Sequence, residues 1–151
     1  MRLTKWTDYT LRVLMHCAAT QRRAQAPTIG EIAERHDISR SHLMKIVMTL
    51  SALGWIESTR GRGGGIRLLK PADQISVGAI LRETETDFNM VECFDSASNT
   101  CHLDRVCKLK NVLHEATQRY LDVLDGVTVA DLLPSSPRQL EQPLKRMTVR
   151  A

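Results

Sequence analysis

Two short helical patterns joined by a tight turn constrain the fold of this chain most strongly. Residues 28–36 repeat apolar side chains at helical spacing behind Thr28, and Glu31 completes a capping box. A second pattern starts after Ser39, a possible cap, and ends at Gly54. Its apolar stripe consists of Leu43, Ile46, Val47, Leu50 and Leu53. This spacing predicts a helix-turn-helix, although a generic helical hairpin would share it.

A glycine-rich segment then predicts a β-hairpin. Residues 55–58 and 66–69 have the character of strands, and residues 59–65, TRGRGGG, form the tip between them. Glycine lets the backbone approach a ligand closely, and arginine supplies positive charge for phosphates. A phosphate-binding loop of an enzyme is the alternative, but the GxxxxGK[ST] pattern and its strand-loop-helix context are absent. Together the two segments predict a winged helix-turn-helix.

The N-terminal half of the chain is basic. Residues 1–70 contain 12 Lys or Arg and 5 Asp or Glu, whereas residues 71–151 contain 9 and 12. This asymmetry indicates that the first half binds a polyanion, and the winged helix makes double-stranded DNA the expected partner. The early turns of the second helix are expected in the major groove, and the hairpin on phosphates or in the minor groove. The predicted contacts are Ser39, Arg40, Ser41, His42, Lys45, Arg60, Arg62 and Arg67.

A first helix is predicted over residues 3–19. Thr7 is its expected cap, which leaves Asp8 in the first turn, where a carboxylate suits the helix dipole. Cys17 lies on the apolar face of this helix and is expected in the core.

The C-terminal half predicts a short helix after Ser76 and a long one from Asp104 to Gly126. The long helix has a single apolar stripe outside the N-terminal domain. We therefore expect it to pack against its own copy in a homodimer suited to a palindromic DNA site. The stripe consists of Val106, Leu109, Val112, Leu113, Ala116, Tyr120, Val123 and Leu124.

The expected fold class is mainly α with a small β-hairpin wing. We expect a DNA-binding domain at residues 1–84, a cluster-binding loop at 85–103, a dimerisation helix and short C-terminal helix at 104–133, and a disordered tail at 134–151. No apolar run approaches the roughly 18 residues of a membrane span. The N-terminus also lacks the layout of a signal peptide, so a cytoplasmic protein without membrane contact is expected. No nucleophile-elbow or metalloprotease pattern suggests an enzyme.

Residues 92–108, ECFDSASNTCHLDRVCK, hold three of the four cysteines among polar neighbours. Three cysteines in such a segment are poor core residues, so Cys93, Cys101 and Cys107 are predicted to bind a metal ion or cluster. They are one short of the usual four ligands. His102 could complete a zinc site, whereas an iron-sulfur cluster tolerates a carboxylate oxygen as its remaining ligand.

Four segments together resemble a known family. They are LTKWTDYTLRVLMHCA, SRSHLMKIVMTLSALGWIESTRGRGGGIRL, the cysteine loop leading into LKNVLHEA, and VTVADLL. This combination is similar to the iron-sulfur winged-helix transcriptional regulators that include IscR and NsrR. The resemblance covers about residues 1–133. It looks closest to the NsrR branch of nitric-oxide-sensing repressors.

The resemblance implies a homodimeric repressor with one 4Fe-4S cluster per subunit. Cys93, Cys101 and Cys107 match the family's cysteine ligands, and Asp8 matches a carboxylate that reaches the cluster from the other subunit. It also implies that nitrosylation of the cluster releases the protein from a palindromic operator. Two features depart from the family. Lys110 occupies the position of a histidine in IscR-type members, and the gap between Cys93 and Cys101 is longer than usual.

Other functions of the same residues remain open on sequence grounds. An iron-sulfur or redox-stress regulator of this fold is one alternative, with a zinc site or a thiol-disulfide switch as its variants. A cluster-bearing electron-transfer protein is another, but it leaves the basic hairpin without a role.

Overall fold

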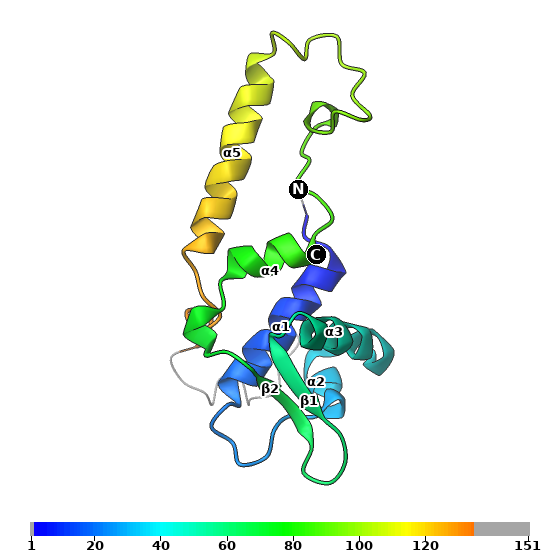
Figure 1. Cartoon of the computed structure of the whole chain (residues 1–151), viewed down its shortest axis with the longest axis vertical. Coiled ribbons are helices and arrows are strands. Elements are labelled where there is room, and N and C mark those ends of the chain that lie inside the picture. Colours follow the sequence, from blue (N-terminus) through cyan, green and yellow to red (C-terminus); the bar gives the residue numbers. More distant parts are fainter. Residues whose placement is uncertain (1, 135–151) are drawn as a thin grey trace, which may run out of the picture.

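Five α-helices and one two-stranded hairpin follow one another along residues 2–134, the part of the chain that the computed structural model describes (Figure 1). This confirms the mainly α fold with a small hairpin. The tail predicted to be disordered lies outside the described residues, except for Pro134. The elements are α1 (Lys5–Ala19), α2 (Ile29–His36), α3 (Arg40–Ala52), β1 (Ile56–Thr59), β2 (Gly65–Leu68), α4 (Val77–Thr84) and α5 (Lys108–Asp125), with short 3-10 turns at Ala72–Gln74 and Glu92–Phe94.

The cap of α1 differs from the prediction. Thr4, not Thr7, is the N-cap residue, and its hydroxyl oxygen accepts the N–H of Thr7 at 3.3 Å. Thr7 is instead fully buried and donates its hydroxyl proton to the side chain of Thr84 at 2.9 Å. Both threonines satisfy the local rule for a cap, and the tertiary contact with α4 decides between them. Asp8 remains in the first turn of α1, as expected.

The N-cap residues of α2 and α3 confirm the prediction, whereas the second half of the predicted capping box is wrong, because the Glu31 carboxylate pairs with Arg23. Thr28 accepts the N–H of Glu31 at 3.2 Å, and Ser39 accepts the N–H of His42 at 3.4 Å. Between the helices, Asp37 adopts a left-handed conformation with φ of 53°, which makes the turn tight. The predicted core stripe of α3 is buried except for Leu53, which is 36% exposed because it lies at the C-cap, beyond the last helical turn.

The hairpin is confirmed, and each end of its two strands differs by one residue from the predicted bounds. Its strands pair antiparallel, with Ile56 opposite Leu68 and Ser58 opposite Ile66. The N–H of Ile66 also donates to the carbonyl of Pro27 at 2.9 Å, which fixes the hairpin to the loop before α2. A Cβ atom on Gly65 would lie 2.6 Å from that of Ala26, so this close approach requires glycine.

The chain returns to the N-terminal core after α5. Val127 accepts the N–H of Val77 at 2.9 Å, the N–H of Val129 donates to Ile75 at 2.9 Å, and Val129 is fully buried. Residues 127–133 form hydrogen-bonded turns, so the prediction of a short C-terminal helix in this segment is wrong. Their hydrogen bonds and the burial of Val129 fix the lower end of α5 to the base of the molecule.

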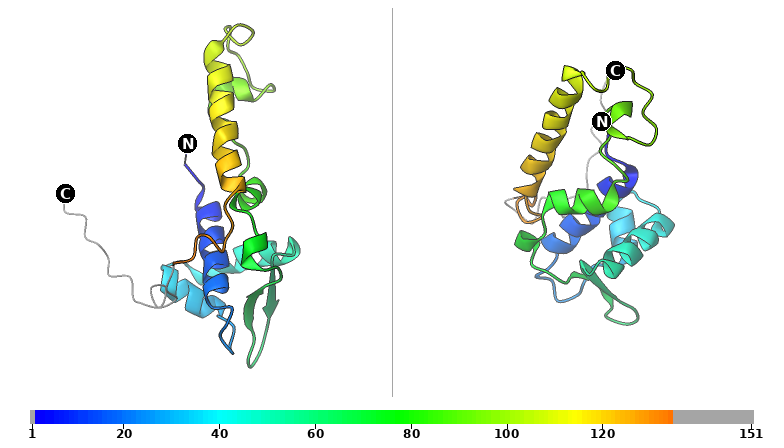
Figure 2. Two further views of the ribbon diagram at one scale, coloured as in Figure 1. Left: turned by 90° about the vertical axis from the view of Figure 1, so that its left-hand side faces the viewer. Right: turned by 45° about the horizontal axis from the view of Figure 1, so that its top comes forward.

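Helix α5 rises from this base, and the cysteine loop runs from α4 to its upper end (Figures 1 and 2). Helix α5 begins at Lys108 and not at the predicted Asp104, because Cys107 is its N-cap residue. Only Thr117 and Leu121 of the helix are buried. The hairpin lies at the opposite end of the molecule (Figure 2). Among the described residues, no helix combines the length and apolar character that a membrane span needs.

We expect Gly78→Ala to destabilise the protein. A Cβ atom at this position of α4 would lie 1.9 Å from a carboxylate oxygen and 2.9 Å from the backbone nitrogen of Asp125 in α5. Replacing a helical glycine by alanine gains about 1 kcal/mol in propensity, whereas overpacking costs about 1–3 kcal/mol. Urea unfolding should show a net loss of stability. Gly126→Ala is the control, because its nearest neighbour would be at 3.6 Å.

Candidate functional site

Helix α3 presents its early polar residues at the surface. Ser39, Arg40, Ser41 and Lys45 are exposed, while the opposite side of the helix is buried against the core. Arg40 lies over α2, because its guanidinium would be 3.1 Å from a Cβ atom on Gly30. These residues therefore lie at the start of an exposed helix that follows a tight turn, the position from which a helix-turn-helix contacts base edges.

His42 differs from its neighbours because its ring packs against α1. The ring centroid lies 6.0 Å from that of Trp6 and 5.1 Å from that of Tyr9, the latter in an edge-to-face arrangement. Its side chain is half-buried. The two ring contacts make His42 a packing contact between α1 and α3, whereas its DNA contact stays a prediction.

The hairpin tip carries exposed positive charge. Arg60 and Arg62 are both exposed, and Gly61 and Gly63 beside them have φ of 92° and 82°. These left-handed conformations suit glycine and make the tip narrow. Arg67 on β2 is also exposed, and its guanidinium donates to the carbonyl of Ala24 at 3.0 Å. The first two arginines therefore extend from the tip, whereas Arg67 lies beside the loop before α2.

Asp8 forms a two-point ion pair within α1. Its carboxylate accepts from Arg12 at 2.9 and 2.7 Å, and both side chains are about 43% exposed. The guanidinium of Arg12 also lies 5.6 Å from the ring centroid of Tyr9. Since Tyr9 contacts His42, a continuous set of contacts joins the Asp8 carboxylate to the first turn of α3.

The N-terminal end of α1 is attached to the start of the cysteine loop. The backbone N–H and the hydroxyl of Thr4 both donate to the carboxylate of Glu85, at 2.9 and 3.1 Å. Glu85 follows directly after α4, and Thr7 contacts Thr84 at the end of that helix. These contacts join the first residue of the loop directly to the helix that carries Asp8.

The three loop cysteines are free thiols in different settings. Cys93 is half-buried and lines a hollow of about 550 Å³ between the loop and α5. Cys101 is exposed. Cys107 caps α5, and its sulfur accepts the N–H of Lys110 at 3.4 Å. Cys107 therefore lies at the N-terminus of α5, with its sulfur directed toward a backbone N–H of the first turn.

Lys110 lies beside two of these cysteines. It forms an ion pair with Asp104, which raises the pKa of Lys110, and the nearby thiols of Cys93 and Cys107 act in the same direction. The ammonium group of Lys110 therefore places positive charge beside the sulfurs of two expected ligands. The histidine of IscR-type members is thus replaced here by a charged neighbour of the expected ligands.

The donor set fits an iron-sulfur cluster chemically. It offers three free thiols in a polar loop, with a cation and a helix N-terminus beside them. Within residues 2–134 of the single chain, no group of three potential metal ligands is gathered at one point. The three cysteines would therefore have to come closer together to hold a cluster.

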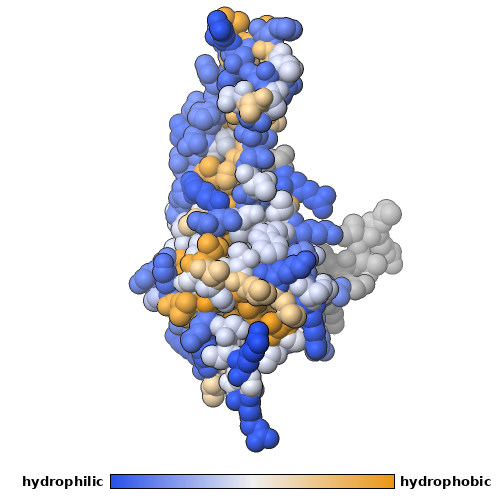
Figure 3. All heavy atoms as spheres, turned by 45° about the vertical axis from the view of Figure 1, so that its right-hand side comes forward, coloured by the Kyte–Doolittle hydropathy of each residue, from blue (hydrophilic) through white to orange (hydrophobic). Residues whose placement is uncertain are grey.

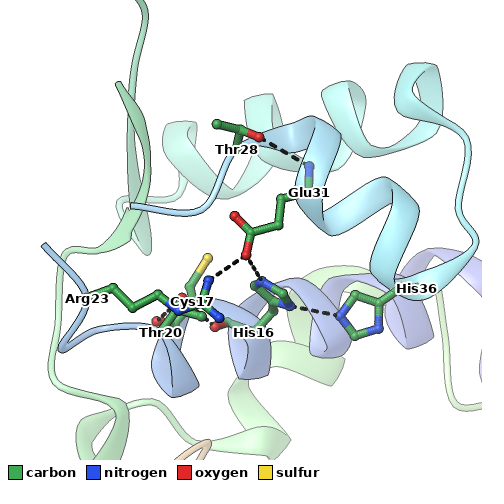
Figure 4. Close-up of polar contacts among 7 residues, drawn as sticks. All are labelled: His16, Cys17, Thr20, Arg23, Thr28, Glu31 and His36. Atoms are coloured by element: carbon green, nitrogen blue, oxygen red, sulfur yellow. Dashed lines mark hydrogen bonds and ion pairs between the residues drawn. The ribbon is translucent and has the colours of Figure 1, made fainter. Parts of the chain in front are cut away.

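A polar cluster that sequence reasoning missed joins α1, α2 and the loop between them (Figure 4). The rings of His16 and His36 contact each other through Nδ1 and Nε2 at 3.2 Å. Glu31 accepts from Arg23 at 2.6 Å and lies 3.6 Å from Nε2 of His16. The Glu31 carboxylate therefore joins α2 to the preceding loop and to α1. The neighbouring Cys17 is 2% exposed, which confirms it as a core residue, and burial raises its pKa to about 12.

We expect this histidine pair to make stability depend on pH. Burial, followed by the charge of His16, lowers the pKa of His36 to about 4, and burial also lowers the pKa of His16. Both pKa values are depressed in the folded state, so the unfolded chain binds more protons below about pH 6.5. Stability is therefore complete above that pH and falls progressively towards pH 4.

Thermal unfolding of the full-length protein at pH 7 and pH 5 measures this effect. His36→Gln should reduce the loss of melting temperature between the two pH values. His102→Gln, at an exposed loop position, is the matched control and should leave that loss unchanged. An equal loss in wild type and His36→Gln would contradict the assignment.

Comparison with known proteins agrees with this geometry. The sequence profile of the Rrf2 family, described as an iron-dependent transcriptional regulator, matches residues 3–135. The chain belongs to the Rrf2 family. It is similar to the HTH-type transcriptional regulator NsrR of Bacillus subtilis strain 168, with 50% identity over 88% of this chain and 90% of the relative. The NsrR of Geobacillus kaustophilus strain HTA426 is 48% identical over the same shares.

Solved structures of this family share the fold. The oxidised form of Staphylococcus aureus CymR has a TM-score of 0.70 and 26% identity, and the match covers 90% of this chain and 98% of CymR. IscR of T. potens has a TM-score of 0.66 and 24% identity, over 87% and 85% of the two chains. This Rrf2 chain is thus a winged-helix, DNA-binding transcriptional regulator of the NsrR type, and its family typically forms dimers.

Proposed function

We propose that this Rrf2 protein is a homodimeric repressor that binds a palindromic operator and leaves it when nitric oxide reacts with a 4Fe-4S cluster. The relatives named NsrR support the assignment to this branch. The observation that carries the mechanism is the set of contacts from Asp8 through Arg12 and Tyr9 to His42. It joins a proposed cluster ligand to the DNA-reading helix within one chain.

Three cysteines of one subunit and one carboxylate of the other would hold the cluster. These ligands are Cys93, Cys101 and Cys107, together with Asp8 of the partner subunit. When bound, the cluster supplies iron atoms with which nitric oxide can react. The ammonium group of Lys110 and the N-terminus of α5 would offset part of the negative charge of a bound cluster and its ligands.

Residues 1–84 would bind DNA with α3 in the major groove. Ser39, Arg40, Ser41 and Lys45 are exposed at its start. Arg60 and Arg62 at the tip, with Arg67 on β2, would contact phosphates or the adjacent minor groove. His42 would act mainly by holding α3 against α1, because its ring contacts Trp6 and Tyr9.

The exposed stripe of α5 would form the dimer interface. Leu109 and Val112 are each 61% exposed, and Val123 is 68% exposed, at successive spacings of three and eleven residues. Both spacings return to nearly the same face of an α-helix, so the three side chains suit packing against a second α5. Pairing of two α5 helices would bring the loop of one subunit near α1 of the other.

The Asp8 carboxylate has two competing partners in this mechanism. In a cluster-bearing dimer Asp8 would serve as a ligand in the other subunit, and Arg12 would then lack its ion pair. Without the cluster, Asp8 would pair with Arg12, as it does in the single chain. A change in the position of Arg12 over the Tyr9 ring would alter the contact of Tyr9 with His42, and so the packing of α3 against α1. A fall in DNA affinity follows from a small displacement of α3.

An anaerobic titration tests the proposal. The full-length protein is loaded with iron and sulfide, and its absorbance and its binding to promoter DNA are followed as nitric oxide is added. Bleaching of the iron-sulfur absorption together with a loss of binding is expected. Colourless protein containing zinc would support a zinc site, and metal-free protein released by oxidant would support a thiol switch. A reversible redox couple without affinity for promoter DNA would favour electron transfer.

A further inference from the structure

The exposed side of α3 is not uniformly polar. Met44 is 52% exposed and Met48 is 70% exposed, and neither belongs to the core cluster. With Ser41 and Lys45 they occupy positions i, i+3, i+4 and i+7, which form one face of the helix. The opposite face, which includes Leu43 and Ile46, is buried. Two large apolar side chains therefore alternate with the polar residues expected to contact DNA.

The two methionines do not pack against the rest of the protein core. They lie on the side of α3 away from α1 and the hairpin, since α3 packs on those elements through its buried stripe. Apolar side chains lie among charged ones over the lower part of the molecule (Figure 3). An unbranched thioether reaches further than a branched side chain and adapts its shape to a neighbour. A partner that matches this face of α3 offers small apolar groups to the methionines, beside phosphates and polar base edges for Ser41 and Lys45.

The major groove offers one apolar group at its floor, the C5-methyl group of thymine. We propose that Met44 and Met48 contact thymine methyl groups and so select A·T pairs at the positions they face. The inference rests on the DNA-binding function, because it places α3 in the major groove. Lys45, between the two methionines, would contribute charge without this selectivity.

Replacement of single thymines by deoxyuridine tests the proposal. Uracil pairs as thymine does but lacks the methyl group, so only the apolar contact is removed. A high-affinity duplex is first selected from a random library with the full-length, cluster-loaded protein, and each thymine is then replaced in turn. At one or two positions in each half-site, wild-type affinity should fall about fourfold, the effect of exposing one buried methyl-sized group.

Met44→Ala and Met48→Ala identify the side chains responsible. Each should abolish the uracil penalty at its own position, and alanine keeps the helix because its propensity is high. Lys45→Ala is the control on the same face. It should weaken binding to every duplex and reduce the salt dependence, yet keep the uracil penalty.

The outcomes separate this inference from the function on which it rests. Wild-type protein that binds the thymine duplex without any uracil penalty would overturn the inference and leave the DNA-binding function intact. A penalty that persists in both methionine variants would also overturn it. If no duplex is selected at all, the DNA-binding function fails and the inference fails with it.

Discussion

Cys101→Ser is expected to lose the iron-sulfur absorption and to bind promoter DNA about a hundredfold more weakly than the wild-type protein. That loss corresponds to about 2.7 kcal/mol, within the usual range of coupling between two sites. Cys101 is the exposed cysteine of the three, so its replacement removes a ligand without opening a cavity. The measurements are iron and sulfide content and operator affinity, both under anaerobic conditions.

Two comparisons make this result specific. Ser98→Ala changes another exposed side chain of the same loop, whose hydroxyl donates to Asp95, and it should retain both cluster and DNA binding. The cluster-free wild type and cluster-free Cys101→Ser should melt at the same temperature, because the thiol makes no packing contribution at an exposed position. Cluster-free protein that binds its operator at full strength would rule out the proposed control by iron and sulfur.

Much of the fold followed from local rules that the sequence displays. The caps at Thr28, Ser39 and Ser76 were predictable because each side chain accepts an N–H only three residues ahead. The errors arose where a distant contact decided the outcome. Thr7 satisfies the rule for a cap but is bonded to Thr84, 77 residues away. Asp104 resembles the start of a helix but pairs with Lys110, and Cys107 takes its place as the cap.

The candidate site also consists of residues that a local sequence pattern marks and of contacts that only the tertiary structure forms. The polar residues of α3 and the arginines of the hairpin are visible in the sequence because an amphipathic period and a Gly/Arg run mark them. The ion pair of Asp8 with Arg12 has helical i, i+4 spacing and could have been found from that signal. The contact of Tyr9 with His42 and the pair of His16 with His36 join separate helices, so no local pattern contains them.

The second large effect is expected from Val112→Glu combined with Val123→Glu on α5. Both valines are more than 60% exposed in the single chain, so the substitutions leave the fold of the subunit unchanged. In a dimer, each new carboxylate would face its copy in an apolar seam, where like charges repel and desolvation is costly. We expect the dimer to dissociate at least about a hundredfold more readily, an increase in free energy of about 2.7 kcal/mol or more.

Sedimentation should then give the chain mass of 17.0 kDa in place of twice that value. Asn111→Glu adds one carboxylate at an exposed polar position on another side of α5 and should remain dimeric. Because Asp8 is proposed to act in the other subunit, the monomer should also lose cluster content and operator affinity together, although none of its cysteines has changed. A monomeric variant that keeps its full iron content would exclude ligation across the dimer while leaving the three cysteines as ligands. The mass and the iron content of one variant therefore distinguish a failure of the interface from a failure of the Asp8 assignment.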